Sequence, residues 1–230
     1  DRMATVGKLA AGIAHEIRNP LAAISGSIEL LKKEIDQKGS NSQLMEIVLG
    51  ETERLNQLIT DFLLYARPIP KTIEPILIND LFQKLIQMLK TRAEHIQLSI
   101  EAEPDLTIRS DPWLIEQVFW NIANNAIEAM PNGGRLKISA GKETRDSVPG
   151  IWLLFSDSGM GIPGSDLSKI FEPFFTTKER GTGLGLSVTW RIIEELKGEI
   201  QVKSEPDKGT DFRIWLPADS RLPHKGGNDD

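Results

Sequence analysis

The sequence of 230 residues predicts two domains: an all-α helical hairpin that forms a dimeric four-helix bundle, followed by an α+β sandwich. Three observations carry this expectation. Apolar residues recur every three or four positions up to about residue 66, as in long amphipathic helices. Pro68 and Pro70 then mark a stiff linker. Beyond them, strand and helix patterns follow in segregated order, which favours a mixed sheet with three helices on one face.

These patterns give four expected segments. A helical hairpin occupies residues 1–67, a linker residues 68–75, the sandwich residues 76–217 and a flexible tail residues 218–230. The tail is polar and rich in Gly and Asp, so we expect it to fray.

The hairpin is expected to contain a first helix from about residue 4 to about 37, turn-forming residues at 38–42, and a second helix that ends before Pro68. One hairpin cannot cover two apolar stripes of roughly 30 and 25 residues, whereas two copies form a four-helix bundle. We therefore expect a homodimer.

The segment His15 to Pro20 reads His-Glu-Ile-Arg-Asn-Pro inside the first helix. His15 lies nearly opposite the apolar stripe, and Asn19 follows one turn later on the same outward face. A proline in mid-helix costs roughly 3 kcal/mol, so we expect Pro20 to be compensated by a function. From these residues alone, a solvated surface histidine is an equally good interpretation.

The second domain is expected to begin its secondary structure at the short apolar run 76–78. Asp111 and Pro112 have the residue types of a helix N-cap and first helical position, and Gly198 is expected to end the last helix. The predicted helices span about 80–92, 112–130 and 184–197, and the predicted strands 96–101, 106–109, 135–140, 151–155, 199–204 and 210–216.

Composition excludes several classes of protein. A charged fraction of 26% and a net charge of -6 do not suggest nucleic-acid binding. The absence of cysteine excludes disulfides and thiolate metal sites. No apolar run approaches the roughly 20 residues that span a bilayer, so a cytoplasmic location is expected. Because the sequence lacks an initiator Met, we expect an upstream continuation, and any membrane attachment would come through it.

Polar residues follow one flank of the predicted helix 112–130. Asn121, Asn125 and Glu128 lie together beside its apolar face. Such an oxygen-bearing edge can hold Mg²⁺ through amide oxygens and water. Taken in isolation, a solvated helix edge is the simpler interpretation.

Two glycine clusters and an aromatic segment complete the candidate site. Asp157 follows a strand and precedes Gly159 and Gly161, where backbone can approach a ligand closely. Gly181-Thr182-Gly183-Leu184-Gly185 opens into a helix, and such an N-terminus attracts phosphate. Between them lies Phe171 to Lys178, in a loop long enough to be a lid.

In this order, the motifs resemble those of the catalytic core of two-component sensor histidine kinases over roughly residues 1–217, most like the nitrogen-regulation and pilus-regulation branch. The resemblance implies a Bergerat-type ATP-binding domain that uses ATP and Mg²⁺. His15 would be autophosphorylated and would pass the phosphoryl group to an Asp of a response regulator receiver domain. Glu16 would fix the tautomer of His15 and take its proton, and Asn19 would help to dephosphorylate the regulator.

The resemblance also assigns the nucleotide site. Asn125 would coordinate Mg²⁺, Asp157 would bind the adenine amine, and the segment from about 162 to 180 would be the ATP lid. Lys178 or Arg180 would reach the γ-phosphate. The remaining nucleotide contacts would come from Asn121, Gly159, Gly161, Gly181, Thr182, Gly183, Leu184 and Gly185.

Three alternatives stay open. An ATPase of the same fold would carry a Glu four residues before the metal-binding Asn, where this chain has Asn121, which cannot act as a base. A serine kinase of the anti-sigma type would lack the long hairpin. An ATP-binding dimeric scaffold without turnover is the third alternative.

Overall fold

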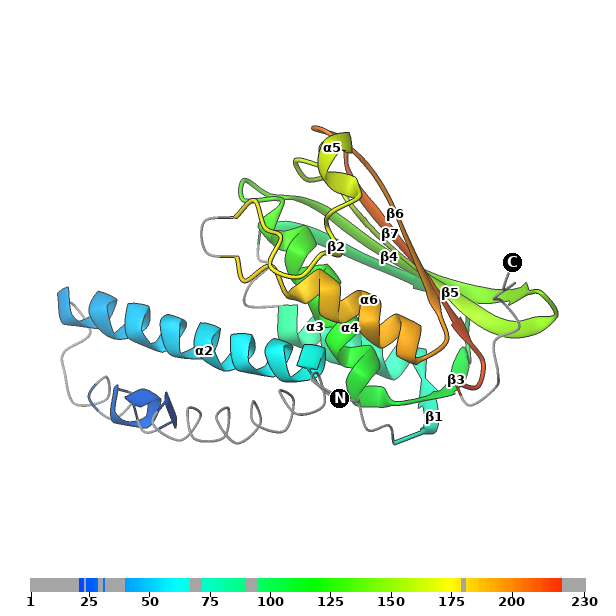
Figure 1. Cartoon of the computed structure of the whole chain (residues 1–230), viewed down its shortest axis with the longest axis horizontal. Helices are drawn as coiled ribbons and strands as arrows, with labels where there is room; N and C mark the ends of the chain where they lie inside the picture. The colour runs from blue at the N-terminus through cyan, green and yellow to red at the C-terminus, as the bar shows by residue number, and fades with distance from the viewer. Residues whose placement is uncertain are drawn as a thin grey trace. The chain divides into compact units, whose positions relative to one another are not determined.

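The computed structural model describes residues 21–22, 24–28, 31, 40–66, 72–89, 95–178 and 181–220. The chain divides into two compact units, Asp1–Pro68 and Ile69–Asp230 (Figure 1). No helix in the described part of the chain is long and apolar enough to cross a membrane.

The first unit contains the helix α2, Ser40–Ala66, and the described residues from Leu21 to Leu31 are also helical. The helix begins within the predicted turn, so the prediction is wrong for residues 40–42. Ser and Asn favour helix N-termini as well as turns, and their residue types do not separate the two structures. The predicted start of the first helix lies outside the described residues.

The second unit is built on a five-stranded mixed sheet in the order β2-β4-β5-β7-β6. Only β2 and β4 are parallel, and the other neighbours are antiparallel. The strands are β2 Ile96–Ala102, β4 Gly134–Arg145, β5 Val148–Asp157, β6 Glu199–Glu205 and β7 Gly209–Pro217.

A second sheet pairs β1, Glu74–Leu77, with β3, Thr107–Ser110, in antiparallel register. This pair was not predicted, and it begins inside the segment predicted to be a linker. The residues after Pro217 join it, because Arg109 donates to the carbonyl of Ala218 at 2.7 Å and accepts from Ser220 at 2.9 Å. The fraying predicted from residue 218 is therefore wrong for residues 218–220, whose backbone finds partners on β3.

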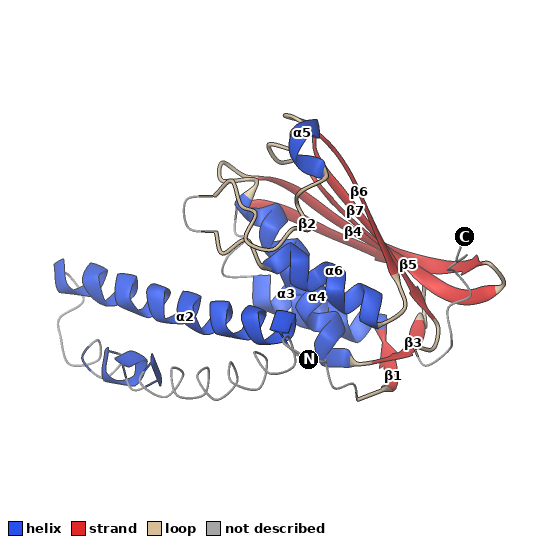
Figure 2. Ribbon diagram, in the orientation of Figure 1, coloured by secondary structure: helices blue, strands red, loops and turns tan. Residues whose placement is uncertain are grey.

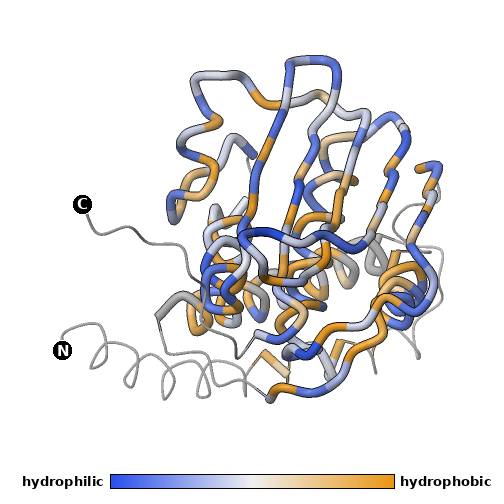
Figure 3. The backbone as a smooth tube through the Cα atoms, turned by 90° about the vertical axis from the view of Figure 1, so that its right-hand side faces the viewer, coloured by the Kyte–Doolittle hydropathy of each residue, from blue (hydrophilic) through white to orange (hydrophobic). Residues whose placement is uncertain are grey.

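Three helices lie on one side of the five-stranded sheet: α3 Ile78–Leu89, α4 Pro112–Glu128 and α6 Gly185–Glu195 (Figure 2). Helix α4 contacts both of the others and the strands β4 and β5. The ring of Phe82 on α3 stacks on that of Phe119 on α4 at 5.3 Å between centroids, and Phe119 contacts Phe155 of β5 edge to face at 5.4 Å. Hydrophobic and hydrophilic segments alternate along the strands, as expected for a sheet with one covered face (Figure 3).

The N-terminus of α4 confirms its predicted capping. Asp111 accepts the backbone N–H of Leu114 at 3.1 Å, and Pro112 opens the helix. Because Asp111 also accepts from Thr72 at 2.6 Å, the cap fixes the start of the chain segment that leads into β1.

Two boundaries differ from the predictions for identifiable reasons. Strands β4 and β5 run on into a hairpin, through Asp146 and Ser147 at φ of 47° and 66°. Such turns usually contain Gly, so the sequence carries no signal for this one. At the end of α6, Lys197 rather than Gly198 takes the left-handed conformation, at φ of 62°. Gly198 is needed for a different reason, because a Cβ there would lie 2.5 Å from the carbonyl oxygen of Trp215.

Candidate functional site

Asp157 is the buried carboxylate at the end of β5, with 8% of its surface exposed. Its Oδ1 accepts the backbone N–H of Gly159 at 2.8 Å and that of Thr210, on β7, at 3.2 Å. No donor among the described residues reaches Oδ2. Because a buried acceptor is costly to leave unpaired, Oδ2 is suited to a ligand that donates a hydrogen bond.

Burial raises the pKa of Asp157 above its ordinary value, and the two backbone donors oppose this shift. The nearby carboxylate of Asp211 adds to the rise in pKa. A ligand that is neutral and donates a hydrogen bond to Asp157 is therefore favoured over a negatively charged one.

Glycines let the backbone around Asp157 pack closely. A Cβ at Gly159 would lie 2.7 Å from the carbonyl oxygen of Ala129 and 2.9 Å from Oδ1 of Asp157. Gly161 has φ of +68°, and a Cβ there would collide with the carbonyl of Glu205. Gly209 has φ of +96°, and a Cβ there would collide with the carbonyl of Asp157. The strand end is thus fixed by neighbours on α4, β6 and β7.

Asn121 joins α4 to α6. It is buried, and its Nδ2 donates to the carbonyl of Gly185 at 3.1 Å and to Oγ1 of Thr189 at 3.4 Å. Thr189 in turn donates to the carbonyl of Gly185 at 2.9 Å. These bonds hold the N-terminus of α6 against the polar flank of α4.

Asn125 and Glu128 lie one and two turns after Asn121 on α4, and both contact a cation from the lid. The ammonium of Lys178 donates to Oδ1 of Asn125 at 2.8 Å and forms a short ion pair with Glu128. Asn124 donates to the other carboxylate oxygen of Glu128 at 2.7 Å. On the predicted polar flank, side-chain oxygens of Asn125 and Glu128 thus bind the ammonium of Lys178.

The segment from Gly181 to Gly185 packs on the aromatic segment of the lid. Gly183 has φ of +67°, its carbonyl accepts from the N–H of Phe174 at 2.9 Å, and a Cβ at Gly183 would collide with the backbone of Phe174. Phe174 has φ of 67° itself, and it is 65% exposed. Thr182 accepts from the N–H of Leu184 at 3.2 Å. No side chain caps the start of α6 at Leu184, which leaves its first backbone donors for an anion.

The structure brings together, in the second unit, most residues predicted for the nucleotide site. Asp157 ends β5, with Gly159 and Gly161 just after it; Asn121 and Asn125 lie on α4, and the segment 181–185 leads into α6. The predicted residues His15, Glu16 and Asn19 lie outside the described residues, as does Arg180.

Sequence reasoning missed Thr210 and Gly209, which fix Asp157 from β7. It also missed Glu128 as the partner of Lys178. A glycine that opens a strand next to a turn was the available signal for Gly209. The other two contacts join residues 53 and 50 positions apart and leave no local pattern.

Two protein-family models match the chain. Residues 5–70 match the His Kinase A (phospho-acceptor) domain. Residues 110–220 match the Histidine kinase-, DNA gyrase B-, and HSP90-like ATPase family.

Curated relatives match over nearly the whole chain. Sporulation kinase E of Bacillus subtilis is 40% identical over 220 residues, which cover 94% of this chain and 29% of that protein. Sensor histidine kinase ZraS of Escherichia coli is 36% identical over 220 residues, which cover 94% of this chain and 46% of that protein. The chain thus spans less than half of each of these two relatives.

Solved structures resemble the chain as well. The catalytic domain of histidine kinase ThkA is 30% identical, with a TM-score of 0.59 over 65% of this chain and 98% of that domain. ThkA in complex with the response regulator protein TrrA matches at 29% identity and a TM-score of 0.66, over 95% of this chain and 63% of that one. Full-length ShkA in complex with AMPPNP matches at 25% identity and a TM-score of 0.75, over 91% of this chain and 45% of that one.

Proposed function

The chain belongs to the two-component sensor histidine kinases, and we propose that it transfers the γ-phosphoryl group of ATP to the imidazole of His15. The phosphoryl group then passes to an Asp of a response regulator. The observation that supports ATP binding is the buried carboxylate of Asp157. Its Oδ1 accepts two backbone hydrogen bonds, and its Oδ2 is left to accept one from a ligand. The match of residues 5–70 to a phospho-acceptor domain supports an acceptor in the first unit.

Asp157 is the proposed adenine contact. Its Oδ2 accepts the exocyclic amine, while Gly159 and Thr210 hold Oδ1 and fix the carboxylate plane. The phosphates lie toward the start of α6, where the segment 181–185 exposes backbone N–H groups and the positive end of the helix dipole. The AMPPNP held by the similar ShkA supports a nucleotide of this class.

Asn125 is the proposed ligand of Mg²⁺. The observation that supports a cation here is the ammonium of Lys178, which lies 2.8 Å from Oδ1 of Asn125. No group of three or more His, Cys, Asp or Glu side chains that could hold a metal occurs among the described residues. Mg²⁺ would therefore depend on Asn125, phosphate oxygens and water, which suits its preference for oxygen ligands. When bound, the ion neutralises charge that develops on the phosphates.

His15 is the proposed nucleophile. A histidine with an ordinary pKa is largely neutral near pH 7, so its imidazole can attack the γ-phosphorus in line. Glu16 accepts the proton of the other ring nitrogen, and Asn19 orients water for dephosphorylation of the regulator. All three roles rest on the family motif His-Glu-Ile-Arg-Asn-Pro at residues 15–20.

Transfer is favoured over hydrolysis by Asn121. A hydrolase of this fold needs a base to activate water near the metal ligand, and an amide cannot accept a proton in that way. The amide nitrogen of Asn121 is instead bonded to Gly185 and Thr189 on α6. The role that fits these contacts is to hold the phosphate-facing end of α6.

The proposed oligomer is a homodimer through the helical hairpin. Large apolar side chains of the first unit are exposed in the single chain: Ile24, Leu31, Ile47, Val48 and Leu55. Because each is already about half buried, burial of the rest would contribute up to about 1.5 kcal/mol each, and a second hairpin supplies a matching apolar surface. A response regulator is the proposed partner, by analogy with the complex of ThkA and TrrA.

The proposal is tested by incubation of the purified chain with γ-labelled ATP and Mg²⁺. We expect acid-labile, alkali-stable label on the wild-type chain and none on a His15→Gln variant. Label that persists in His15→Gln would assign the phosphate to another residue. Nucleotide binding without label in the wild type would instead favour the scaffold alternative.

A further inference from the structure

The ammonium of Lys178 contacts the amide oxygen of Asn125, which is the proposed ligand of Mg²⁺. The same ammonium is ion-paired with Glu128, and Asn125 and Glu128 both lie on α4. A lid cation and a metal ion cannot share one amide oxygen at bonding distance, because two positive charges this close repel strongly even with solvent screening.

The backbone around Lys178 is fixed from within the lid. The N–H of Lys178 donates to Oγ1 of Thr176 at 3.1 Å, and its carbonyl accepts from Gly181 at 3.2 Å. Gly181 packs so closely on Thr176 that a Cβ there would collide with its hydroxyl. These backbone contacts hold Lys178 where its ammonium reaches α4.

Glu128 is held in turn by its own helix. Asn124 donates to its Oε1 at 2.7 Å, so the second oxygen is left for Lys178. Both charged side chains are partly exposed, at 39% for Lys178 and 45% for Glu128. An ion pair of this exposure is modest in energy, so a competing ligand can release it.

We propose that Glu128 is a positioning residue that holds Lys178 over Asn125 in the nucleotide-free chain, so that lid and metal compete for the same amide oxygen. The inference rests on the proposed nucleotide site. Asn125 would hold Mg²⁺ that comes with nucleotide in place of the ammonium, and Lys178 would then be free to leave α4. Glu128 therefore couples occupation of the metal position to movement of the lid.

Hydrogen exchange of the lid in the nucleotide-free chain tests the inference without reference to activity. Glu128→Gln keeps the shape of the side chain and removes its charge. We expect amides of residues 171–178 to exchange about two- to five-fold faster, the range for loss of a partly exposed ion pair. Lys178→Gln also loses the bond to Asn125, so it is expected to give at least the same rise, and the double variant no more than Lys178→Gln alone.

Glu116→Gln is the matched control. Glu116 lies on the same helix and pairs with Lys84 at 2.6 Å, away from the lid. Its loss is expected to leave exchange of residues 171–178 unchanged. The charge-reversed pair Glu128→Lys with Lys178→Glu is expected to restore slow exchange.

Two outcomes overturn the inference: lid exchange that is unchanged in Glu128→Gln, or effects of the two single changes that add in the double variant. Calorimetry of AMPPNP with Mg²⁺ on the wild type separates this from the proposed function. Wild-type binding with unchanged exchange in Glu128→Gln rejects the positioning role alone. Absent wild-type binding rejects the nucleotide site and with it the competition for Asn125.

Discussion

Thr210 and Asp157 are joined by a hydrogen bond from the backbone of one strand to the buried carboxylate of its neighbour, at 3.2 Å. The bond crosses from the start of β7 to the end of β5, beside Gly209, where a side chain would collide with the carbonyl of Asp157. Since the N–H of Gly159 donates to the same oxygen, the carboxylate has one fixed oxygen and one oxygen for a ligand. A substitution of Asp157 that keeps Oδ1 and changes only Oδ2 should therefore affect ligand binding and leave the fold intact.

Asp157→Asn is expected to abolish nucleotide binding while the domain stays folded. An amide oxygen can still accept from Gly159 and Thr210, so the native contacts of Oδ1 are retained. The amide nitrogen that replaces Oδ2 is a donor and faces the donor amine of adenine. We expect at least a 100-fold loss of affinity for AMPPNP by calorimetry, about 2.7 kcal/mol or more.

Asp211→Asn is the control for this substitution. Asp211 is close enough to raise the pKa of Asp157, whereas the backbone donors that fix the carboxylate belong to Gly159 and Thr210. Affinity near that of the wild type is expected. Equal affinities of the Asp157→Asn and wild-type chains would remove Asp157 from the adenine site.

The stability of the domain should also depend on pH through Asp157. Burial raises the pKa of Asp157 in the folded state above that of the unfolded state. The ionised carboxylate then opposes folding at neutral pH, and this penalty disappears as the pH falls through the raised pKa. We expect Asp157→Asn to be at least as stable as the wild type at pH 7 and to lose that relative advantage toward pH 4.

Urea unfolding of both chains between about pH 4 and pH 7 checks this sign. The difference between the two free energies of unfolding removes the contributions of all other titrating groups that the two chains share. A difference that stays constant over this range would mean that the folded carboxylate titrates as it does in the unfolded chain.

Gly183→Ala is expected to destabilise the lid, whereas Gly185→Ala is expected to be tolerated. Gly183 combines φ of +67° with a backbone contact to Phe174 that leaves no room for a Cβ. A Cβ at Gly185 would lie 3.8 Å from the side chain of Asn121, an ordinary contact. We expect a loss of about 1–3 kcal/mol for the first variant and little change for the second. Thermal unfolding and lid exchange without nucleotide measure both, and similar values for the two would contradict the difference in packing.

Local signals explain which parts of the fold could be predicted from the sequence. Helix α4 begins where predicted because Asp111 and Pro112 supply a cap and a first residue with unambiguous roles. The hairpin of β4 and β5 was missed because Asp146 and Ser147 take positive φ without glycine. Residues 218–220 were predicted to fray because their pairing with Arg109 depends on a strand more than a hundred positions away.

The candidate site divides in the same way. Asp157, Asn125 and the glycines of 181–185 could be selected because each stands in a recognisable motif beside a strand or helix end. The contacts that hold them could not be predicted: Thr210 carries no motif, and Glu128 was placed on the polar flank of its helix but its pairing with Lys178 comes from a contact across the fold. Sequence motifs thus identify the residues proposed to bind the ligand, and the fold is needed to identify the residues that position those ligand-binding residues.

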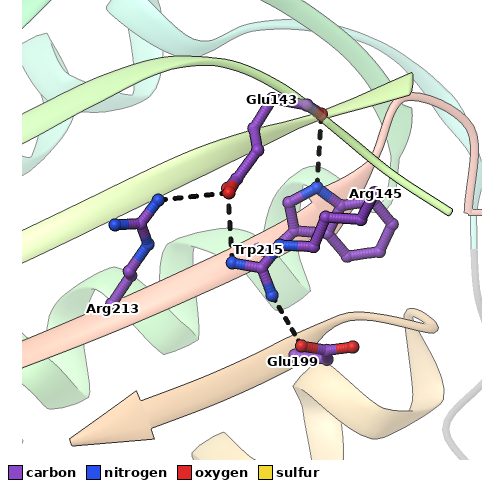
Figure 4. Close-up of polar contacts among 5 residues, drawn as sticks. All are labelled: Glu143, Arg145, Glu199, Arg213 and Trp215. Carbon is purple, nitrogen blue, oxygen red and sulfur yellow. Dashed lines mark hydrogen bonds and ion pairs between the residues drawn. The ribbon is translucent and has the colours of Figure 1, made fainter. Parts of the chain in front are cut away.

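Arg145→Ala should destabilise the second unit far more than loss of an exposed lysine. Arg145 bridges Glu199 of β6 at 2.6 Å and Glu143 of β4 at 3.3 Å, and its guanidinium lies 5.6 Å from the ring centroid of the buried Trp215 (Figure 4). Trp215 donates to the carbonyl of Glu143 at 3.3 Å, so the group connects three strands. Only 20% of the Arg145 side chain is exposed. We expect a loss of about 1–2 kcal/mol from two ion pairs and one cation–π contact.

Lys84→Ala, which removes the pair between Lys84 and Glu116, is the comparison for Arg145→Ala in urea unfolding. That pair is solvated, so its loss is expected to leave the unfolding midpoint unchanged. Arg145→Lys should fall between Arg145→Ala and the wild type, because an ammonium keeps the charge but loses the planar group that covers Trp215. If Arg145→Lys were as stable as the wild type, charge alone would account for the group. If Arg145→Ala matched Lys84→Ala, the contacts of Arg145 would contribute nothing to the free energy of unfolding.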